Sequence, residues 1–168
     1  MKQNTCLMVA GLFLMLFAPT AWAADQPLVT FKSLSPEVAL EVAQAAFKKC
    51  RADGYQIGVS VVDRGGNLQV TLRDRFAGPH TAGTSYRKAW TALSFRTDTS
   101  ELAKITRDGP SWAIRGVTNA LPLGGGGPSR AGDGGLVGAV GVSGAPSGDA
   151  DDGCARAGIA AVEDKIAF

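Results

Sequence analysis

The sequence predicts an α+β domain in which helices cover a mainly antiparallel sheet. Two observations support this prediction: the chain contains a β-hairpin between residues 55 and 74, and segments with helical spacing stand before and after it. A further segment rich in β-branched residues, 134–144, supplies another strand. Because short turns join strands of opposite direction, the sheet is expected to be mainly antiparallel.

The first helix is expected in SPEVALEVAQAAFKKCRADG, which runs from Ser35 to Gly54. Ser35 is a suitable N-cap, Pro36 fits the first helical position, and Gly54 ends the helix. Apolar and small residues recur at helical spacing and form one face, made of Ala39, Val42, Ala43, Ala46 and Cys50.

The next segment, YQIGVSVVDRGGNLQVTLRD, predicts the hairpin. Its two halves alternate apolar with small or polar residues, at Ile57, Val59 and Val61 and again at Leu68, Val70 and Leu72. Between the halves, residues 64–67 read Arg-Gly-Gly-Asn, which is the composition of a tight turn.

Two helices should follow the hairpin. The first begins after Pro79 and continues through TAGTSYRKAWTALSF, with Ala82, Tyr86, Ala89 and Leu93 as its inner face. The second is short and begins near 98–99, where Asp-Thr can cap it. Residues 111–129 lack a regular period, so we expect irregular chain with one short strand.

The C-terminal part predicts a turn, a strand and a helix. Residues 132–135 read Gly-Asp-Gly-Gly, a hairpin turn, and GGLVGAVGVSG alternates as a strand does. The helix begins at DADDG, where acids favour the helix dipole. Small residues mark one side of each element, Ala139, Gly141 and Ser143 on the strand and Ala150, Cys154, Ala157 and Ala161 on the helix. We therefore expect this strand and this helix to pack closely.

Residues 1–23 have the pattern of a secretory signal peptide. Lys2 precedes the apolar run 7–17, and residues 21–23 read Ala-Trp-Ala, a small-x-small cleavage site. The run is too short to span a membrane, which needs about 20 apolar residues. We expect cleavage after Ala23, and residues 24–168 as a single periplasmic or secreted domain with no membrane span.

Charge and cysteine content restrict the partners and the redox state. The formal net charge is +2 and falls to +1 without Lys2, which indicates no nucleic-acid binding surface. Cys50 and Cys154 remain in the mature chain. Export permits a disulfide between them, and two buried thiols are the alternative.

The glycine-rich stretch LPLGGGGPSRAGDGGLVGAVGVSG does not fit a nucleotide-binding loop. A phosphate loop needs Gly-Lys-Ser/Thr at the start of a helix, whereas Pro128 follows the glycines here and a strand comes next. No βαβ unit surrounds the glycines either. Residues 124–127 are then either a floppy surface loop or backbone exposed to a ligand or another subunit. In the second case, Gly125 and Gly126 are the candidate contacts.

The order of these motifs resembles one known family. VVDRGGNL, RKAWTALSFRTDT, LPLGGGG and GAVGVSG followed by DADD resemble the GlcG/HbpS family of haem-binding proteins, which is similar to the C-terminal domain of PduO. The resemblance covers residues 35–162. It implies an α-β-α sandwich similar to the profilin-like fold, a haem cofactor and a homo-oligomer. One departure is the segment 126–129, Gly-Gly-Pro-Ser, where the family commonly has an apolar residue before the proline.

Haem binding directs attention to the residues around the one histidine of the chain. His80 is the candidate iron ligand, and therefore the candidate metal residue, with Tyr86 as a second candidate. Arg87 and Lys88 are candidate partners of the haem propionates, and Phe76 offers an apolar wall. The alternative for His80 is an exposed position at a helix N-terminus. No Cys-x-x-Cys-His motif is present, so covalent attachment is excluded.

Other function classes stay open. The family name GlcG is associated with glycolate, so a small-carboxylate enzyme or accessory protein is the alternative function, and a purely structural role is a third. Ser143, His80 and Asp149 could form a catalytic triad, but the serine lacks the Gly-x-Ser-x-Gly setting. Asp149, Asp151 and Asp152 could bind a metal, although acids in a first helical turn need none. The sequence therefore favours an exported binding protein for haem, with haem handling or redox sensing as its role.

Overall fold

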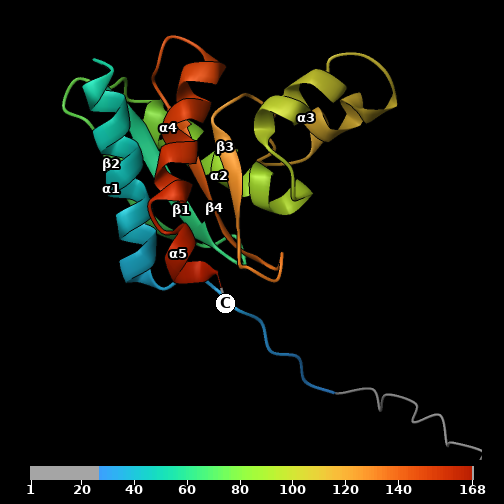
Figure 1. Ribbon diagram of the computed structural model, residues 1–168. Coiled ribbons are helices and arrows are strands. Elements are labelled where there is room, and N and C mark those ends of the chain that lie inside the picture. Colours follow the sequence, from blue (N-terminus) through green and yellow to red (C-terminus); the bar gives the residue numbers. More distant parts are fainter. Residues whose placement is uncertain (1–26, 168) are drawn as a thin grey trace, which may run out of the picture. The chain divides into compact units, whose positions relative to one another are not determined.

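The computed structural model describes residues 27–167 (Figure 1). Residues 31–167 form one compact unit. The predicted signal peptide, residues 1–23, lies outside the described residues. Among residues 27–167, no helix has both the length and the apolar character that crossing a membrane requires.

The elements follow the predicted order. They are α1 (Pro36–Ala52), β1 (Gly58–Asp63), β2 (Leu68–Arg73), α2 (Thr81–Phe95), α3 (Thr99–Ile105), the 3-10 helix η1 (Pro110–Gly116), β3 (Gly126–Arg130), β4 (Leu136–Ser143), α4 (Gly148–Ala160) and α5 (Glu163–Ile166). Ser35 caps α1 as expected, because its side chain accepts a hydrogen bond from the Val38 amide. The segment 111–129, expected to be irregular chain with one short strand, contains most of η1 and, as its strand, most of β3.

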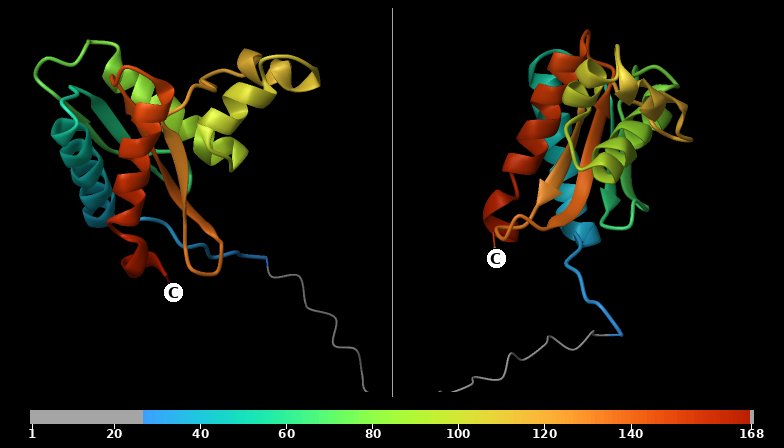
Figure 2. Two further views of the ribbon diagram at one scale, coloured as in Figure 1. Left: turned by 45° about the horizontal axis from the view of Figure 1, so that its top comes forward. Right: turned by 90° about the vertical axis from the view of Figure 1, so that its right-hand side faces the viewer.

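The sheet has the order β2-β1-β4-β3, and each neighbouring pair is antiparallel. Helices α1 and α4 lie side by side on one face, and α2 covers the other face (Figures 1 and 2). Alternation along β1 explains the two layers, since Val59 and Val61 pack with α1 and α4 whereas Val62 packs with α2. The predicted α-β-α sandwich with an antiparallel sheet is confirmed.

The small side of β4 packs against α2, and the prediction that it meets the last helix is wrong. A Cβ atom on Gly141 would collide with the Ser85 carbonyl and lie 2.6 Å from the Ala89 nitrogen, both on α2. On α4, Cys154 and Gly158 contact α1, and a Cβ on Gly158 would lie 2.7 Å from the Val42 carbonyl oxygen. The backbone of β4 therefore packs closely against α2, and that of α4 packs closely against α1. The sequence had instead predicted close packing of β4 against α4.

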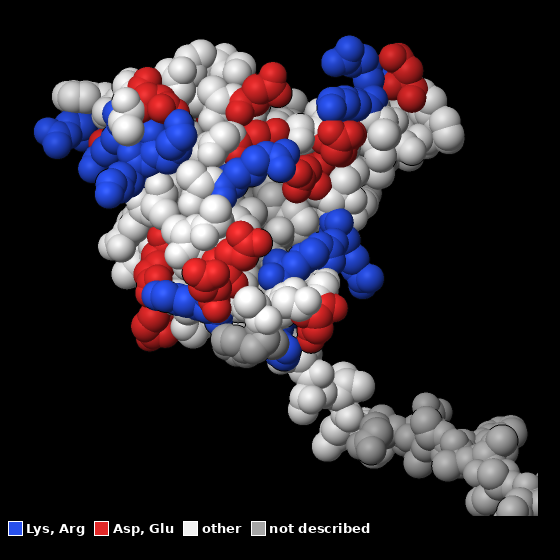
Figure 3. Space-filling view, in the orientation of Figure 1, with Lys and Arg blue, Asp and Glu red and all other residues white. Residues whose placement is uncertain are grey.

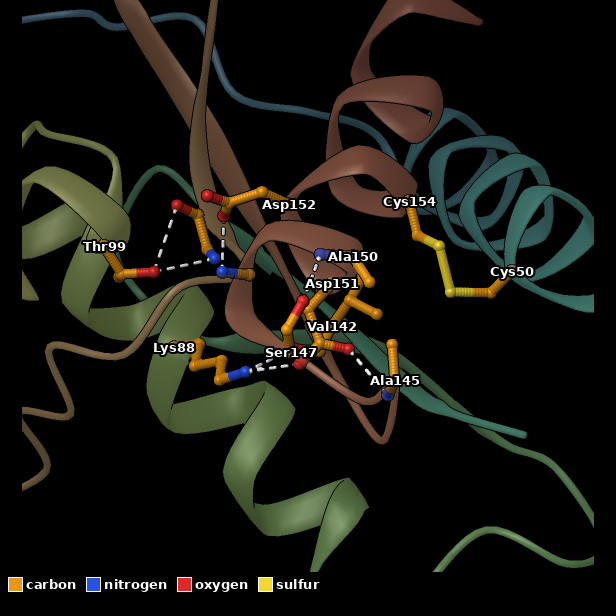
Figure 4. Close-up of polar contacts among 12 residues, drawn as sticks. Cys50, Lys88, Thr99, Val142, Ala145, Ser147, Ala150, Asp151, Asp152 and Cys154 are labelled. Carbon is orange, nitrogen blue, oxygen red and sulfur yellow. Dashed lines mark hydrogen bonds and ion pairs between the residues drawn. A yellow bond between two sulfur atoms is a disulfide. The ribbon is translucent and has the colours of Figure 1, made fainter. Parts of the chain in front are cut away.

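A disulfide joins α1 to α4 between Cys50 and Cys154, with their Cα atoms 5.5 Å apart (Figure 4). Both residues are buried in the core between the two helices. Of the two alternatives left open by the sequence, the structure has the disulfide.

Strand β3 forms despite Pro128 because it lies at the edge of the sheet. The Gly126 amide donates to the Thr99 hydroxyl at 2.8 Å, so this edge of the strand faces α3 and not β4. Pro128, two residues further, faces the same way and needs no partner for a missing N–H. The departure from the family pattern at this position is therefore compatible with a regular strand.

Candidate functional site

A hollow of 450 Å³ opens where the start of α2, the β4–α4 loop and the segment before β3 meet. Its walls are mostly small residues, interrupted by one histidine and one ion pair. The lining residues are Gly78, His80, Thr81, Lys88, Ala103, Leu123, Gly124, Ser143, Gly144, Ala145, Pro146, Ser147, Gly148 and Asp151.

His80 stands at the rim of this hollow, at the N-cap position of α2. Its side chain is exposed and makes no capping hydrogen bond. The imidazole lies over Gly78, where an added Cβ would be 2.7 Å from its Cε1 atom. His80 is therefore exposed at a helix N-terminus, which was one alternative from the sequence. It also borders a cavity with its ring nitrogens available, as the other alternative, an iron ligand, requires.

Lys88 and Asp151 form the charged wall of the hollow (Figure 4). The Lys88 Nζ lies 2.8 Å from Asp151 Oδ2 and donates a second hydrogen bond to the Val142 carbonyl at 2.9 Å. Asp151 also accepts a hydrogen bond from the Ala145 amide at 3.0 Å. Burial raises the pKa of Asp151, and the charge and hydrogen bond of Lys88 oppose that rise. This pair fixes the β4–α4 loop against α2.

Gly125 and Gly126 are buried, and their amides have hydrogen-bond partners inside the protein. The Gly125 amide donates to the Asp152 carboxylate, and the Gly126 amide donates to the Thr99 hydroxyl. Gly125 has a φ of 111°, a conformation that favours glycine. A Cβ on Gly126 would lie 2.6 Å from the Lys88 carbonyl oxygen. Close packing therefore accounts for these glycines, and it is Gly124 that borders the hollow.

The remaining predicted residues lie around α2 but not together in the hollow. Arg87 donates to the Asn119 and Ala120 carbonyls and fixes the segment after η1. Tyr86 packs partly buried against the apolar cluster on the α2 side of the sheet. Phe76, on the β2–α2 loop, is 80% exposed. Of the predicted site residues, the structure brings only His80 and Lys88 to the hollow.

Sequence reasoning missed the ion pair and its role. Lys88 lies on the buried face of α2, next to Ala89 and Ala92. The small apolar residues around it in the sequence could have indicated that this face is buried. Asp151 and Asp152 were considered as dipole partners or metal ligands, and each instead holds one segment of the site. Within residues 27–167, the His, Cys, Asp and Glu side chains do not gather in groups of three that could hold a metal ion.

The fold is an α-β-α sandwich, and the hollow offers room for a small ligand. The family of haem-degrading HbpS-like proteins matches residues 34–160, and the chain belongs to this family. It is also 32% identical over 126 residues to corrinoid adenosyltransferase PduO of Salmonella typhimurium. That match covers 73% of this chain and 37% of PduO, so the chain spans little more than a third of that relative.

Solved structures agree with the family. The crystal structure of HbpS is 43% identical with a TM-score of 0.75, and the match covers 80% of this chain and 93% of HbpS. A double mutant of Streptomyces reticuli HbpS is 42% identical with a TM-score of 0.76, covering 85% and 97% of the two chains. The structure of PduOC in complex with heme is 29% identical with a TM-score of 0.69, covering 77% and 94%.

Proposed function

We propose that this chain is an exported protein that binds haem non-covalently in the hollow beside His80. The observation that carries the proposal is the similarity to PduOC, whose structure was solved with heme bound. The family description, which concerns haem degradation, supports the same ligand. His80, the one histidine of the sequence, borders the hollow with its imidazole available.

The residues of the hollow fit a haem. Neutral imidazole is a common ligand of haem iron, and the wall offers Leu123, Ala145 and Pro146 as apolar contacts. A volume of 450 Å³ lies within the range of small-molecule sites, about 300–1,000 Å³. Phe76, four residues before His80 on the same loop, is exposed but does not line the hollow. A bound haem iron supplies redox and ligand-binding chemistry, and the protein supplies its position and surroundings.

A haemin titration tests the proposal. Mature protein, 24–168, is mixed with increasing haemin, and the absorption spectrum is recorded with His80→Ala and His80→Gln beside the wild type. We expect a sharp band that saturates near one haem per chain and shifts in both variants. A band that saturates identically in all three proteins would show that His80 is not the iron ligand, and Tyr86 would be the next candidate. A broad spectrum that never saturates contradicts haem binding, and small carboxylates of the glycolate type then become the ligands to test.

Export is part of the proposal. The disulfide between Cys50 and Cys154 supports an oxidising compartment, because cytosolic thiols are normally kept reduced. Cleavage after Ala23 predicts that the protein recovered outside the cytoplasm begins at Ala24, which intact-mass measurement detects. In that compartment, the role we propose is haem handling or redox sensing. Following the haem spectrum under peroxide distinguishes stable storage from the haem degradation for which the family is named.

We also propose that the protein forms a homo-oligomer. The support is the segment with α3 and η1, which leaves Ile105, Trp112 and Val117 exposed; Trp112 is 62% exposed. None of the residues of η1 is buried. Light scattering after size-exclusion chromatography is expected to give a multiple of the chain mass for the wild type. Trp112→Ser should reduce it, and a monomeric wild type contradicts this part of the proposal.

A further inference from the structure

A second hollow adjoins the one beside His80. It has a volume of 210 Å³ and is lined by Ser100, Ala103, Lys104, Arg107, Gly124, Gly148 and Asp149. Three of these residues, Ala103, Gly124 and Gly148, also line the first hollow. The two hollows therefore meet at residues that carry at most a methyl group.

The boundary that the two hollows share includes the backbones of Gly124 and Gly148. Gly124 and Gly148 approach so closely that a Cβ on Gly124 would lie 2.9 Å from the Gly148 Cα. Neither residue has a side chain that could separate the hollows, and Ala103 adds only one carbon atom. A ligand longer than either hollow can therefore lie across both.

The far end of this groove carries two cations. Lys104 makes an ion pair with Glu101 at 2.7 Å, and both side chains are exposed. The pKa of Lys104 is raised, chiefly by the hydrogen bond to Glu101, so the ammonium group is charged. The guanidinium of Arg107 has neither a hydrogen bond nor an ion pair with any residue between 27 and 167. Asp149 is the acidic residue of this hollow. Figure 3 shows side chains of both signs gathered over the α3 segment at the upper right.

These two cations differ from the other two basic residues near the site. Arg87 is occupied by the Asn119 and Ala120 carbonyls, and Lys88 by Asp151 in a buried pair. An exposed ion pair such as Lys104–Glu101 is weak and exchanges readily with another carboxylate. A guanidinium without a partner is available for a bidentate carboxylate contact.

We propose that the two hollows form one groove, and that Lys104 and Arg107 bind the free carboxylates of a tetrapyrrole whose iron is held at the His80 end. This rests on the proposed haem binding and specifies how the ligand lies: the macrocycle crosses Gly124 and Gly148, and its carboxylates point to the end of α3. The groove then selects tetrapyrroles with free carboxylates over esterified ones.

The test compares haemin with haemin dimethyl ester, which lacks the free carboxylates. Both are titrated into the wild type, Lys104→Gln/Arg107→Gln and Lys48→Gln/Lys49→Gln. The last variant is a matched control, because it removes the same charge from α1, which lines neither hollow, and Lys49 likewise has an ion-pair partner close in sequence, the C-cap residue Asp53. Thermal unfolding of each variant shows that it is folded.

We expect the wild type and the control to prefer haemin over its ester. The Lys104/Arg107 variant should bind haemin about tenfold more weakly and lose the preference, with an unchanged Soret position. A preference retained in that variant, or lost equally in the control, overturns the proposal while haem binding stands. A Soret shift in that variant also overturns it, because the cations would then act at the iron. A wild type that binds neither compound overturns the proposed function and this proposal together.

Discussion

Lys88 and Asp151 join the two helical layers beside the end of β4. Their Nζ and Oδ2 atoms are 2.8 Å apart, and the two side chains are only 5% and 6% exposed. Lys88 belongs to α2 on one face, and Asp151 belongs to α4 on the other. Because both residues line the hollow beside His80, the pair holds the shape of the proposed ligand site as well as the packing of the layers.

Removing one partner of this pair should be costly. Lys88→Met leaves the Asp151 carboxylate buried without its cation, and we expect a loss of about 3–5 kcal/mol in the free energy of unfolding. The double variant Lys88→Met/Asp151→Asn should be more stable than Lys88→Met alone. Urea unfolding measures both. The matched control, Lys165→Met, breaks the exposed pair with Glu41 and should cost less than about 1 kcal/mol. Equal losses from the two single lysine variants would contradict a structural role for the buried pair.

The position of the His80 ring depends on Gly78. In Gly78→Ala, the new Cβ would lie 2.7 Å from Cε1 of the imidazole, and the exposed ring is free to turn away. We therefore expect a small change in stability, below about 1 kcal/mol, together with a clear change in the haemin spectrum. Gly83→Ala is the control, since a Cβ there meets nothing within 4 Å. It should leave the spectrum unchanged, and an unchanged spectrum in Gly78→Ala would argue against ligation by His80.

Close packing of β4 on α2 makes Gly141 sensitive to any side chain. Gly141→Ala places a carbon against the Ser85 carbonyl and the Ala89 amide, both backbone groups that cannot turn away. We expect a loss of about 3 kcal/mol or failure to fold. Gly153→Ala, on α4 and facing open space, should instead stabilise the protein by about 0.5–1 kcal/mol. Thermal and urea unfolding of the two variants should thus move in opposite directions, and a tolerated Gly141→Ala would contradict this packing.

The disulfide should contribute strongly to stability because it closes a long loop. Cys50 and Cys154 are separated by 104 residues, and removing such a link typically costs about 2–5 kcal/mol. We expect Cys50→Ala/Cys154→Ala to melt at a lower temperature than the wild type. Dithiothreitol should lower the melting temperature of the wild type towards that of the variant and leave the variant unchanged. A wild type insensitive to reduction would show that the bond contributes little.

Acid should weaken the contact between α1 and the loop after β2. Asp74, with a side chain 1% exposed, accepts two hydrogen bonds from Arg51, at 2.7 and 2.9 Å. The hydrogen bond from Arg51 is the chief cause that lowers the pKa of Asp74. The folded protein therefore releases this proton more readily than the unfolded chain, so the stabilisation is present above about pH 4 and is lost as the pH falls through the folded pKa.

The stability difference between wild type and Asp74→Asn should accordingly be full at pH 6 and shrink at lower pH. Urea unfolding at a series of pH values measures it. Asp108→Asn changes the same charge at an exposed position and should differ little from the wild type at any pH. A difference for Asp74→Asn that stays constant down to pH 3 would contradict the assignment to this ion pair.

Local patterns were sufficient to predict most of the elements. Capping at Ser35, alternation from Ile57 to Leu72 and the turn at 132–135 each depend on neighbours in sequence, and each is present in the structure. Which helix packs against which strand was harder to predict from the sequence. The small residues of β4 could pack against the helices on either face of the sheet. The register in which β4 pairs with β1 decides that Gly141 faces α2.

The site was predicted less completely, because its residues meet only in the folded chain. His80 was selected because the sequence has one histidine and the family resemblance suggested haem; it lines the hollow, and its role as iron ligand stays a prediction. Lys88 was considered as a partner of the haem propionates, and nothing near it in sequence shows that Asp151, 63 residues later, is its partner. The groove towards Lys104 and Arg107 depends on the contact between Gly124 and Gly148, which no local pattern reveals.

The most direct test of the central claim uses the fact that the sequence has one histidine. Untagged mature protein is prepared with ¹⁵N-labelled histidine, loaded with haemin, and studied by pulsed electron paramagnetic resonance at the iron. Ligation by His80 predicts that the axial imidazole coupling changes from ¹⁴N to ¹⁵N. A saturable haem complex whose nitrogen couplings are the same in labelled and unlabelled protein would contradict haem binding through His80.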